Sequence, residues 1–244
     1  RMRNGQMDQA RSTFRASGLP AERVLSPFQD KPVLSGWVTT SGKVQADFER
    51  GVLLPAGLTS RQPLQILVQD GRLYQVPVLS SLLSILNLPA VLQGQVKFDE
   101  DGLPFDRLKL VGSLNNGVVT AKEFLLDSPI LKISGTGRYD PVADEFDMVL
   151  ATSPLGSYSD MLKRIPLFGH LLSGDRQGFD TAVFELKGSA NKPQLRYLPA
   201  ESLMMGVKGT AQLALDILVN AVTLPQKAFS LAEDSVTGGE EEDF

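Results

Sequence analysis

Several residue types on which catalytic sites depend are scarce or missing. The chain of 244 residues has no cysteine, which excludes disulfides, thiolate metal sites and cysteine nucleophiles. Its one histidine, His170, cannot supply a zinc site built from several histidines. A serine–histidine–acid triad would depend on His170, yet the sequence has no Gly-x-Ser-x-Gly elbow. We therefore expect a protein that is not an enzyme and holds no metal or cofactor.

Charge and hydropathy exclude two further classes. Lys and Arg number 24 against 28 Asp and Glu, a net charge of −4, whereas a general nucleic-acid binder presents a basic face. The longest uncharged run, between Arg72 and Lys97, is interrupted by Pro77 and Pro89. A membrane-spanning helix needs about 20 mostly apolar residues, so this run is a poor candidate. We expect no nucleic-acid partner.

What the sequence does contain is two-residue alternation of apolar and polar side chains, most clearly over residues 105–150. Alternation with period two is typical of a half-buried β-strand. The alternation breaks at 115–117, 127–129 and 140–144, where Asn, Asp, Gly, Ser and Pro are typical of turns. Because parallel strands need long crossovers, these short connections predict an antiparallel meander.

The alternation also predicts which face each side chain occupies. Leu131 and Ile133 fall on one face of their strand, and Lys132, Ser134 and Thr136 fall on the other. Successive strand side chains point to opposite faces. We therefore expect a sheet with one apolar face and one solvent-exposed face.

The remaining segments give a predicted domain organisation. Residues 36–50 read as strand, turn at Ser41-Gly42, and strand, while Asp70-Gly71 is expected to turn the chain after a further strand. Apolar residues at helical spacing predict a helix over 78–88. The complete division is a weakly patterned lead-in at 1–35, an antiparallel β domain at 36–198 with helical inserts at 78–88 and 157–165, an amphipathic helix at 199–225, and an acidic, disordered tail at 226–244.

The apolar face of the predicted sheet has two interpretations. Helices 78–88, 157–165 and 200–223 could cover it and make an ordinary core, as happens to most half-apolar sheets. Alternatively, it lines an open trough that takes acyl chains. The candidate lining residues are Phe48, Ile66, Val68, Phe98, Leu110, Phe124, Leu126, Leu131, Ile133, Phe146, Met148, Phe184 and Leu186.

Several motifs resemble the C-terminal region of AsmA-like proteins. They are IPLFGHLLSGD at 165–175, VFELKG at 183–188, NKPQ at 191–194, LLSILNLP at 82–89, and QDGRL at 69–73. Further similarity lies in NGVVT at 116–120, LDSP at 126–129, and Leu198-Pro199 before a glycine-containing apolar helix. The resemblance covers about residues 35–225.

The resemblance implies a large, curved antiparallel sheet around a hydrophobic groove. AsmA-like proteins are envelope proteins of Gram-negative bacteria, associated with outer-membrane biogenesis and phospholipid transfer, so it implies a phospholipid partner and a periplasmic location on an inner-membrane-anchored chain. It gives no catalytic residues. A second interpretation is a structural or interaction module that docks onto an outer-membrane assembly or secretion partner, and inner- or outer-membrane proteins are then its partners.

Overall fold

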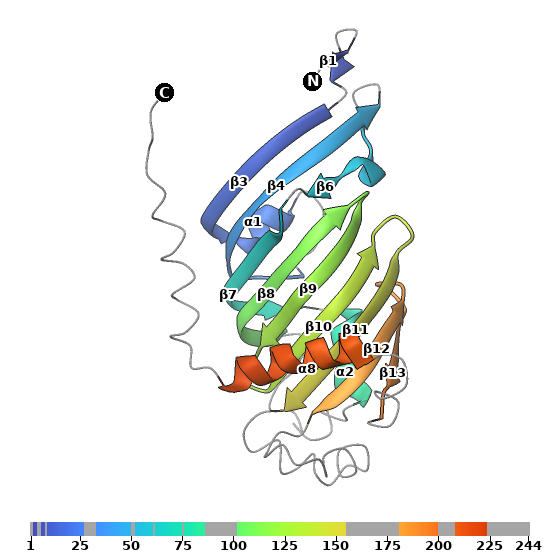
Figure 1. Ribbon diagram of the computed structural model, residues 1–244. Helices are drawn as coiled ribbons and strands as arrows, with labels where there is room; N and C mark the ends of the chain where they lie inside the picture. Colours follow the sequence, from blue (N-terminus) through green and yellow to red (C-terminus); the bar gives the residue numbers. More distant parts are fainter. Residues whose placement is uncertain are drawn as a thin grey trace.

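The computed structural model contains one large antiparallel sheet with helices on both of its sides (Figure 1). The residues that the structure describes are 2–3, 6–7, 9–26, 33–49, 52–60, 62–74, 76–85, 102–154, 181–199 and 208–223.

Eleven strands form this sheet, and every pair in it is antiparallel. The main path runs in the order β13 (Pro193–Tyr197), β12 (Ala182–Gly188), β11 (Glu145–Pro154), β10 (Leu131–Asp140), β9 (Val118–Asp127), β8 (Leu103–Asn115), β7 (Leu64–Leu73), β4 (Trp37–Glu49) and β3 (Gln9–Pro20). The short strands β5 (Val52–Leu53) and β6 (Thr59–Ser60) also pair with β4. A separate two-stranded sheet joins β1 (Met2–Arg3) and β2 (Gln6–Met7).

The predicted mostly-β fold is confirmed, and so is the meander over residues 105–150. It forms β8 to β11, each paired with the next strand along the chain. The turn between β8 and β9 uses Asn116 and Gly117, which have φ values of 50° and 82°. Two consecutive residues in the left-handed region suit a two-residue hairpin turn, because its twist matches that of the flanking strands. Phe184 and Leu186 alternate with Glu185 and Lys187, which predicts a strand, and the structure confirms it as β12; β13 pairs with it.

Two predicted turns are wrong, because the chain continues straight through them. β4 extends without interruption through Ser41-Gly42. Gly42 is needed there for close packing, since a Cβ at this position would collide with Leu64 and lie 3.1 Å from Cζ of Phe14. Likewise, β7 extends through Asp70-Gly71. Asp70 takes a left-handed φ of 51° inside the strand, and a Cβ at Gly71 would meet the Ser35 carbonyl oxygen.

The lead-in predicted at residues 1–35 is also more ordered than its pattern indicates. Residues 9–20 form β3, the edge strand of the sheet, and helix α1 (Ala21–Leu25) follows directly. Alternation is weak in β3 because its inner positions carry small residues, among them Ala10, Ser12 and Ala16.

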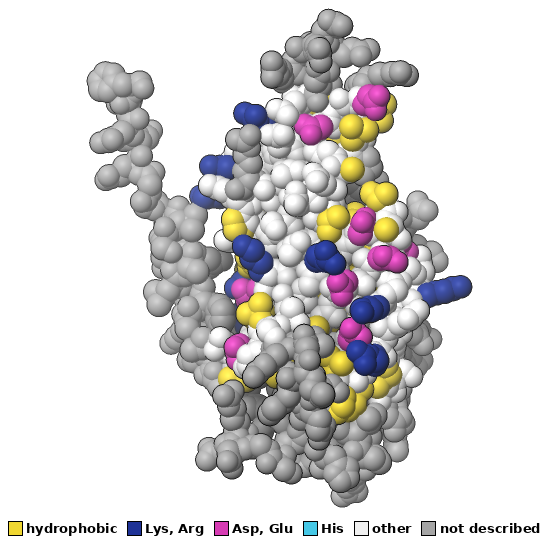
Figure 2. All heavy atoms as spheres, turned by 45° about the vertical axis from the view of Figure 1, so that its right-hand side comes forward, with side chains coloured by type: hydrophobic (Ala, Val, Ile, Leu, Met, Phe, Trp, Pro, Cys, Tyr) yellow, Lys and Arg dark blue, Asp and Glu magenta, His cyan; other side chains and the backbone are white. Residues whose placement is uncertain are grey.

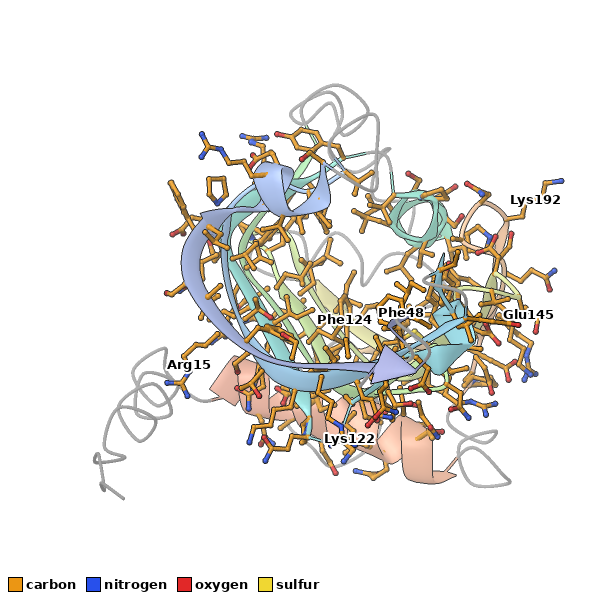
Figure 3. All side chains as sticks on the ribbon, turned by 90° about the horizontal axis from the view of Figure 1, so that it is seen from above. Arg15, Phe48, Lys122, Phe124, Glu145 and Lys192 are labelled. Atoms are coloured by element: carbon orange, nitrogen blue, oxygen red, sulfur yellow. The ribbon has the colours of Figure 1, made fainter. Side chains whose placement is uncertain are left out.

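The sheet is strongly curved, and its two faces carry different helices (Figure 3). Helix α2 (Pro77–Ile85) packs against the concave side, where its buried leucines join the main apolar cluster. Helix α8 (Lys208–Thr223) lies across the convex side of β9, β10 and β11. A 3-10 turn, Pro55–Gly57, follows β5.

Helix α2 confirms the helix predicted at 78–88, up to Ile85, and α8 confirms the last helix over 208–223. Several predictions lie outside the described residues: Phe98 and its strand, the helix at 157–165, His170, the first residues of the last predicted helix, and the acidic tail. None of the helices in the described part of the chain is long and apolar enough to cross a membrane.

The prediction that Lys132, Ser134 and Thr136 face solvent is wrong, because α8 covers this part of the convex face. Ser134 and Thr136 are buried, and the Ser134 hydroxyl donates a hydrogen bond to the backbone carbonyl of Ala214 in α8 (2.6 Å). Lys132 is largely buried as well and forms an ion pair with Asp127 (2.8 Å). α8 therefore covers the polar face of the sheet, not the apolar face that one interpretation assigned to it.

Candidate functional site

The concave face of the sheet is apolar because strand register places the alternating side chains in transverse rows. One row joins Val38, Val68, Leu108, Leu126 and Ile133, each directly opposite the next. The adjacent row, two residues along the strands, contains Ile66, Leu110 and Phe124. Side chains opposite each other on one face of an antiparallel pair lie in contact, so the rows form a continuous apolar surface.

Solvent exposure divides this concave face into two parts. In the first row, Val68 and Leu126 are 1% exposed and Ile133 is 5% exposed, while Leu108 is half-buried. In the adjacent row, which lies nearer the turn between β8 and β9, Ile66, Leu110 and Phe124 are half-buried. The concave face is therefore closed near α2 and accessible to solvent toward the β8–β9 turn.

Twelve of the thirteen candidate lining residues are described, and they divide between these two parts. The closed part contains Val68, Leu126, Leu131, Ile133, Phe184 and Leu186, all of them buried. The open part contains the half-buried residues Phe48, Ile66, Leu110, Phe124, Phe146 and Met148. Figure 3 shows both Phe48 and Phe124 on the inner side of the curve.

Helix α2 and the strands it faces close one part of the concave face. Leu79, Leu82 and Leu83 of α2 belong to the same apolar cluster as Leu126 and Ile133. Helical spacing predicts this helix, but the candidate lining residues do not include its leucines. Their spacing of three and four residues, facing a predicted apolar sheet, is the signal that identifies them.

Further exposed apolar side chains lie next to the end of β4. Phe48 is the register partner of Leu53 in β5. Val52, Leu53 and Leu54 are 67%, 44% and 37% exposed, respectively. A run of three apolar residues has no two-residue alternation, so the sequence pattern does not identify these three. The position of Leu53 opposite Phe48 follows from the pairing of β5 with β4.

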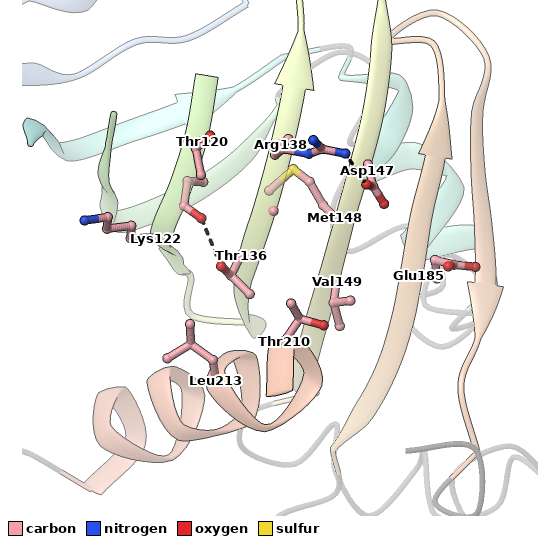
Figure 4. A pocket seen from close by; sticks show the side chains of 12 residues that line it. Thr120, Lys122, Thr136, Arg138, Asp147, Met148, Val149, Glu185, Thr210 and Leu213 are labelled. Carbon is pink, nitrogen blue, oxygen red and sulfur yellow. Dashed lines mark hydrogen bonds and ion pairs between the residues drawn. The ribbon is translucent and has the colours of Figure 1, made fainter. Parts of the chain in front are cut away.

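The convex face carries a shallow depression of about 370 Å³ beside the first turns of α8 (Figure 4). Its walls include Lys122, Arg138 and Leu213. Arg138 pairs with Asp147 at 2.9 Å, and the Thr136 hydroxyl donates to the Ala121 carbonyl at 2.9 Å. Much of the polar lining is therefore engaged in ion pairs and hydrogen bonds within the protein. The described lining residues do not include a nucleophilic side chain hydrogen-bonded to a general base.

Basic and acidic side chains are interleaved over the middle of the convex surface (Figure 2). Lys109 pairs with Glu123 (2.9 Å), and Glu185 accepts hydrogen bonds from Lys187 and Arg196. Burial by itself would raise the pKa of Glu185, but the hydrogen bonds and charges of Lys187 and Arg196 together lower that pKa below its ordinary value. The Lys109–Glu123 and Arg196–Glu185 pairs join neighbouring strands and have a structural role.

The carboxylates near the β10–β11 turn are structural too. Asp144 accepts hydrogen bonds from the Tyr139 hydroxyl (3.1 Å) and the Ala190 backbone N–H (3.0 Å), which ties this turn to the β12–β13 turn. Burial and the neighbouring Asp144 raise the pKa of Tyr139. Glu145 is exposed. Within the described segments, no three His, Asp or Glu side chains come together as a metal site.

We compared the chain with known proteins in three ways. A scan against protein-family models and searches of curated proteins and of solved structures found no match to this chain.

Proposed function

We propose that the open part of the concave face binds the acyl chains of phospholipids, and that the protein acts without catalysis in carrying or holding lipid in a bacterial envelope. The observation that carries this proposal is the exposure gradient along one continuous apolar surface. Phe124, Leu110 and Ile66 extend a buried core into a half-exposed lining.

The energetics of the proposal follow from apolar burial. A lipid tail gains about 0.8 kcal/mol for each methylene removed from water. Contact of several methylenes with Ile66, Leu110 and Phe124 would therefore outweigh the loss of chain freedom. The exposed side chain of Leu53, on the same face as its register partner Phe48, would be among the first that an entering acyl chain meets.

The resemblance to AsmA-like proteins over about residues 35–225 supports the same proposal. It suggests a periplasmic location, an inner-membrane-anchored chain and a role in outer-membrane biogenesis. A curved antiparallel sheet is the architecture that this resemblance implies, and the strands from β3 to β13 form such a sheet. Phospholipid is accordingly the ligand class that we propose.

Native mass spectrometry of protein purified from a Gram-negative host tests the proposal directly. We expect phospholipid-sized adducts on the wild-type chain, and their loss in Phe124→Asp, because a carboxylate in the middle of the lining disfavours an acyl chain. Lys122→Gln is the matched control: it lies on the same strand but points to the convex side, and it changes the net charge by the same amount.

A second arm supplies the ligand in vitro. Wild-type protein is incubated with vesicles that contain a fluorescent phospholipid, and then separated from them by size. We expect transfer of the fluorescent lipid to the wild type and the Lys122→Gln variant, and little transfer to Phe124→Asp. Absence of lipid on the wild type in both arms, or equal lipid on folded Phe124→Asp, would contradict the proposal.

A further inference from the structure

The last strand of the sheet, β3, has one long edge that no strand in the described part of the chain covers. β3 spans Gln9–Pro20 and pairs with β4 on its other edge. An exposed strand edge presents a row of backbone N–H and C=O groups, and natural proteins shorten, bend or cover such edges. β3 is twelve residues long, and its only irregularity is the shift between Ala16 and Leu19 near Gly18.

The side chains on the convex side of this edge are basic. Arg11 and Arg15 are exposed, and Lys43 is opposite Thr13, between the register partners of the two arginines. Figure 3 shows Arg15 pointing away from the concave side. No acidic residue occurs anywhere in Gln9–Pro20.

These cations are not neutralised within the described part of the chain. Arg11 donates hydrogen bonds to the amide oxygens of Gln45 (3.2 Å) and Gln9 (3.3 Å), which are uncharged. No carboxylate among the described residues pairs with Arg11, Arg15 or Lys43. The basic edge thus differs from the middle of the convex face, where cations pair with carboxylates on neighbouring strands.

We propose that the outer edge of β3 receives an acidic β-strand from another polypeptide. The incoming strand would hydrogen-bond to the backbone of residues 9–16 and place alternating carboxylates opposite Arg11 and Arg15. Strand addition of this kind takes its affinity from main-chain hydrogen bonds and its specificity from alternate side chains. This site lies on the edge of the sheet and is separate from the open part of the concave face.

The same charges disfavour a second copy of the chain as the occupant. Two β3 strands that paired antiparallel about Thr13 would place Arg11 of each copy opposite Arg15 of the other. Like charges directly opposite each other destabilise a strand pair, whereas opposite charges stabilise it. The arginines therefore act against self-association and in favour of a partner whose exposed residues are Asp or Glu.

Fluorescence anisotropy with two labelled eight-residue peptides, TEVEVEVT and TKVKVKVT, tests the proposal. We expect the glutamate peptide to bind the wild type about tenfold more tightly than the lysine peptide, because two cross-strand pairs change from attractive to repulsive. In the Arg11→Glu/Arg15→Glu variant this preference should reverse. Hydrogen exchange of residues 9–20 should slow when the preferred peptide is bound.

The matched control is Lys122→Glu/Lys192→Glu, which changes the net charge equally at exposed positions away from β3. We expect it to keep the wild-type preference. Reversal in this control, or binding without protection of residues 9–20, would overturn the proposal, because attraction would then depend on net charge alone. Dimerisation of the wild type through β3, or binding of anionic phosphatidylglycerol vesicles in place of the glutamate peptide, would overturn it as well.

Discussion

At the scale of single residues, the sheet is joined by charged pairs whose partners lie on neighbouring strands. Glu185 of β12 is an example, because it accepts a hydrogen bond from Arg196 Nε on β13 and forms an ion pair with the same guanidinium, while Lys187 on its own strand is a further partner. Its side chain is 17% exposed, while those of Lys187 and Arg196 are 55% and 67% exposed. Glu185 therefore holds the short edge strand β13 through contacts that solvent partly screens.

The lowered pKa of Glu185 predicts a dependence of stability on pH. A carboxyl whose pKa is lower in the folded state than in the unfolded state contributes stability above its unfolded pKa, which is near 4.5. That contribution is lost as the pH falls through the lower folded value. At pH 6 we expect the free energy of unfolding of the wild type to be higher than that of Glu185→Gln. The difference should be at most about 1 kcal/mol, because solvent screens the exposed partners of Glu185.

Urea denaturation of wild type and Glu185→Gln between pH 3 and pH 6 measures this difference. The difference should shrink steadily on acidification. A difference that stayed constant over this range would show that the carboxylate charge contributes nothing.

At the scale of elements, α8 packs onto the convex face through small side chains. Ala211, Ala214, Leu215 and Leu218 recur at helical spacing and contact a second apolar cluster, separate from that of the concave face. Ala214 is fully buried, and its carbonyl accepts the hydrogen bond from Ser134. The close approach of this helix to the sheet depends on the small side chains of Ala211 and Ala214.

We therefore expect Ala214→Leu to destabilise the protein by about 1–3 kcal/mol, because added methylenes in a well-packed interface force backbone shifts. The control is Leu213→Ala on the neighbouring position, where the side chain is 44% exposed. It should change stability by less than about 0.5 kcal/mol. Chemical denaturation of both variants measures the effect, and equal stabilities would show that α8 does not pack closely on the sheet.

At the scale of the whole molecule, the concave face combines a core with an accessible surface. Ile133 lies in the closed part, between Leu126 and Thr152 in register, and Phe124 lies in the open part. The two positions are on adjacent strands and on the same face of the sheet. They differ in whether a charged group placed there can reach water.

We expect Ile133→Asp to unfold the protein, because an unpaired carboxylate in a buried apolar site costs several kcal/mol, roughly 3 or more. Phe124→Asp should remain folded, since a half-exposed position lets the carboxylate reach solvent. Circular dichroism and denaturant midpoints of the two variants provide the measurement. If both variants unfolded, the concave face would be closed throughout.

Much of the fold follows from the sequence alone. Two-residue alternation was sufficient to predict the strands β8 to β12 and their apolar side, because side-chain direction in a strand depends only on local geometry. Helical spacing was sufficient to predict α2, and Asn116-Gly117 was sufficient to predict the hairpin turn between β8 and β9. The absence of cysteine and the presence of a single histidine exclude whole classes of site by composition alone.

Other features were decided by tertiary contacts between residues far apart in the chain. Gly42 and Asp70-Gly71 have the residue types of turns, but Phe14, Leu64 and Ser35 surround these glycines and keep the strands continuous. α8 packs on the polar face because Ser134 bonds to it and small residues allow its approach. The division of the concave face into closed and open parts depends on where α2 packs, and alternation along a strand carries no information about what covers it.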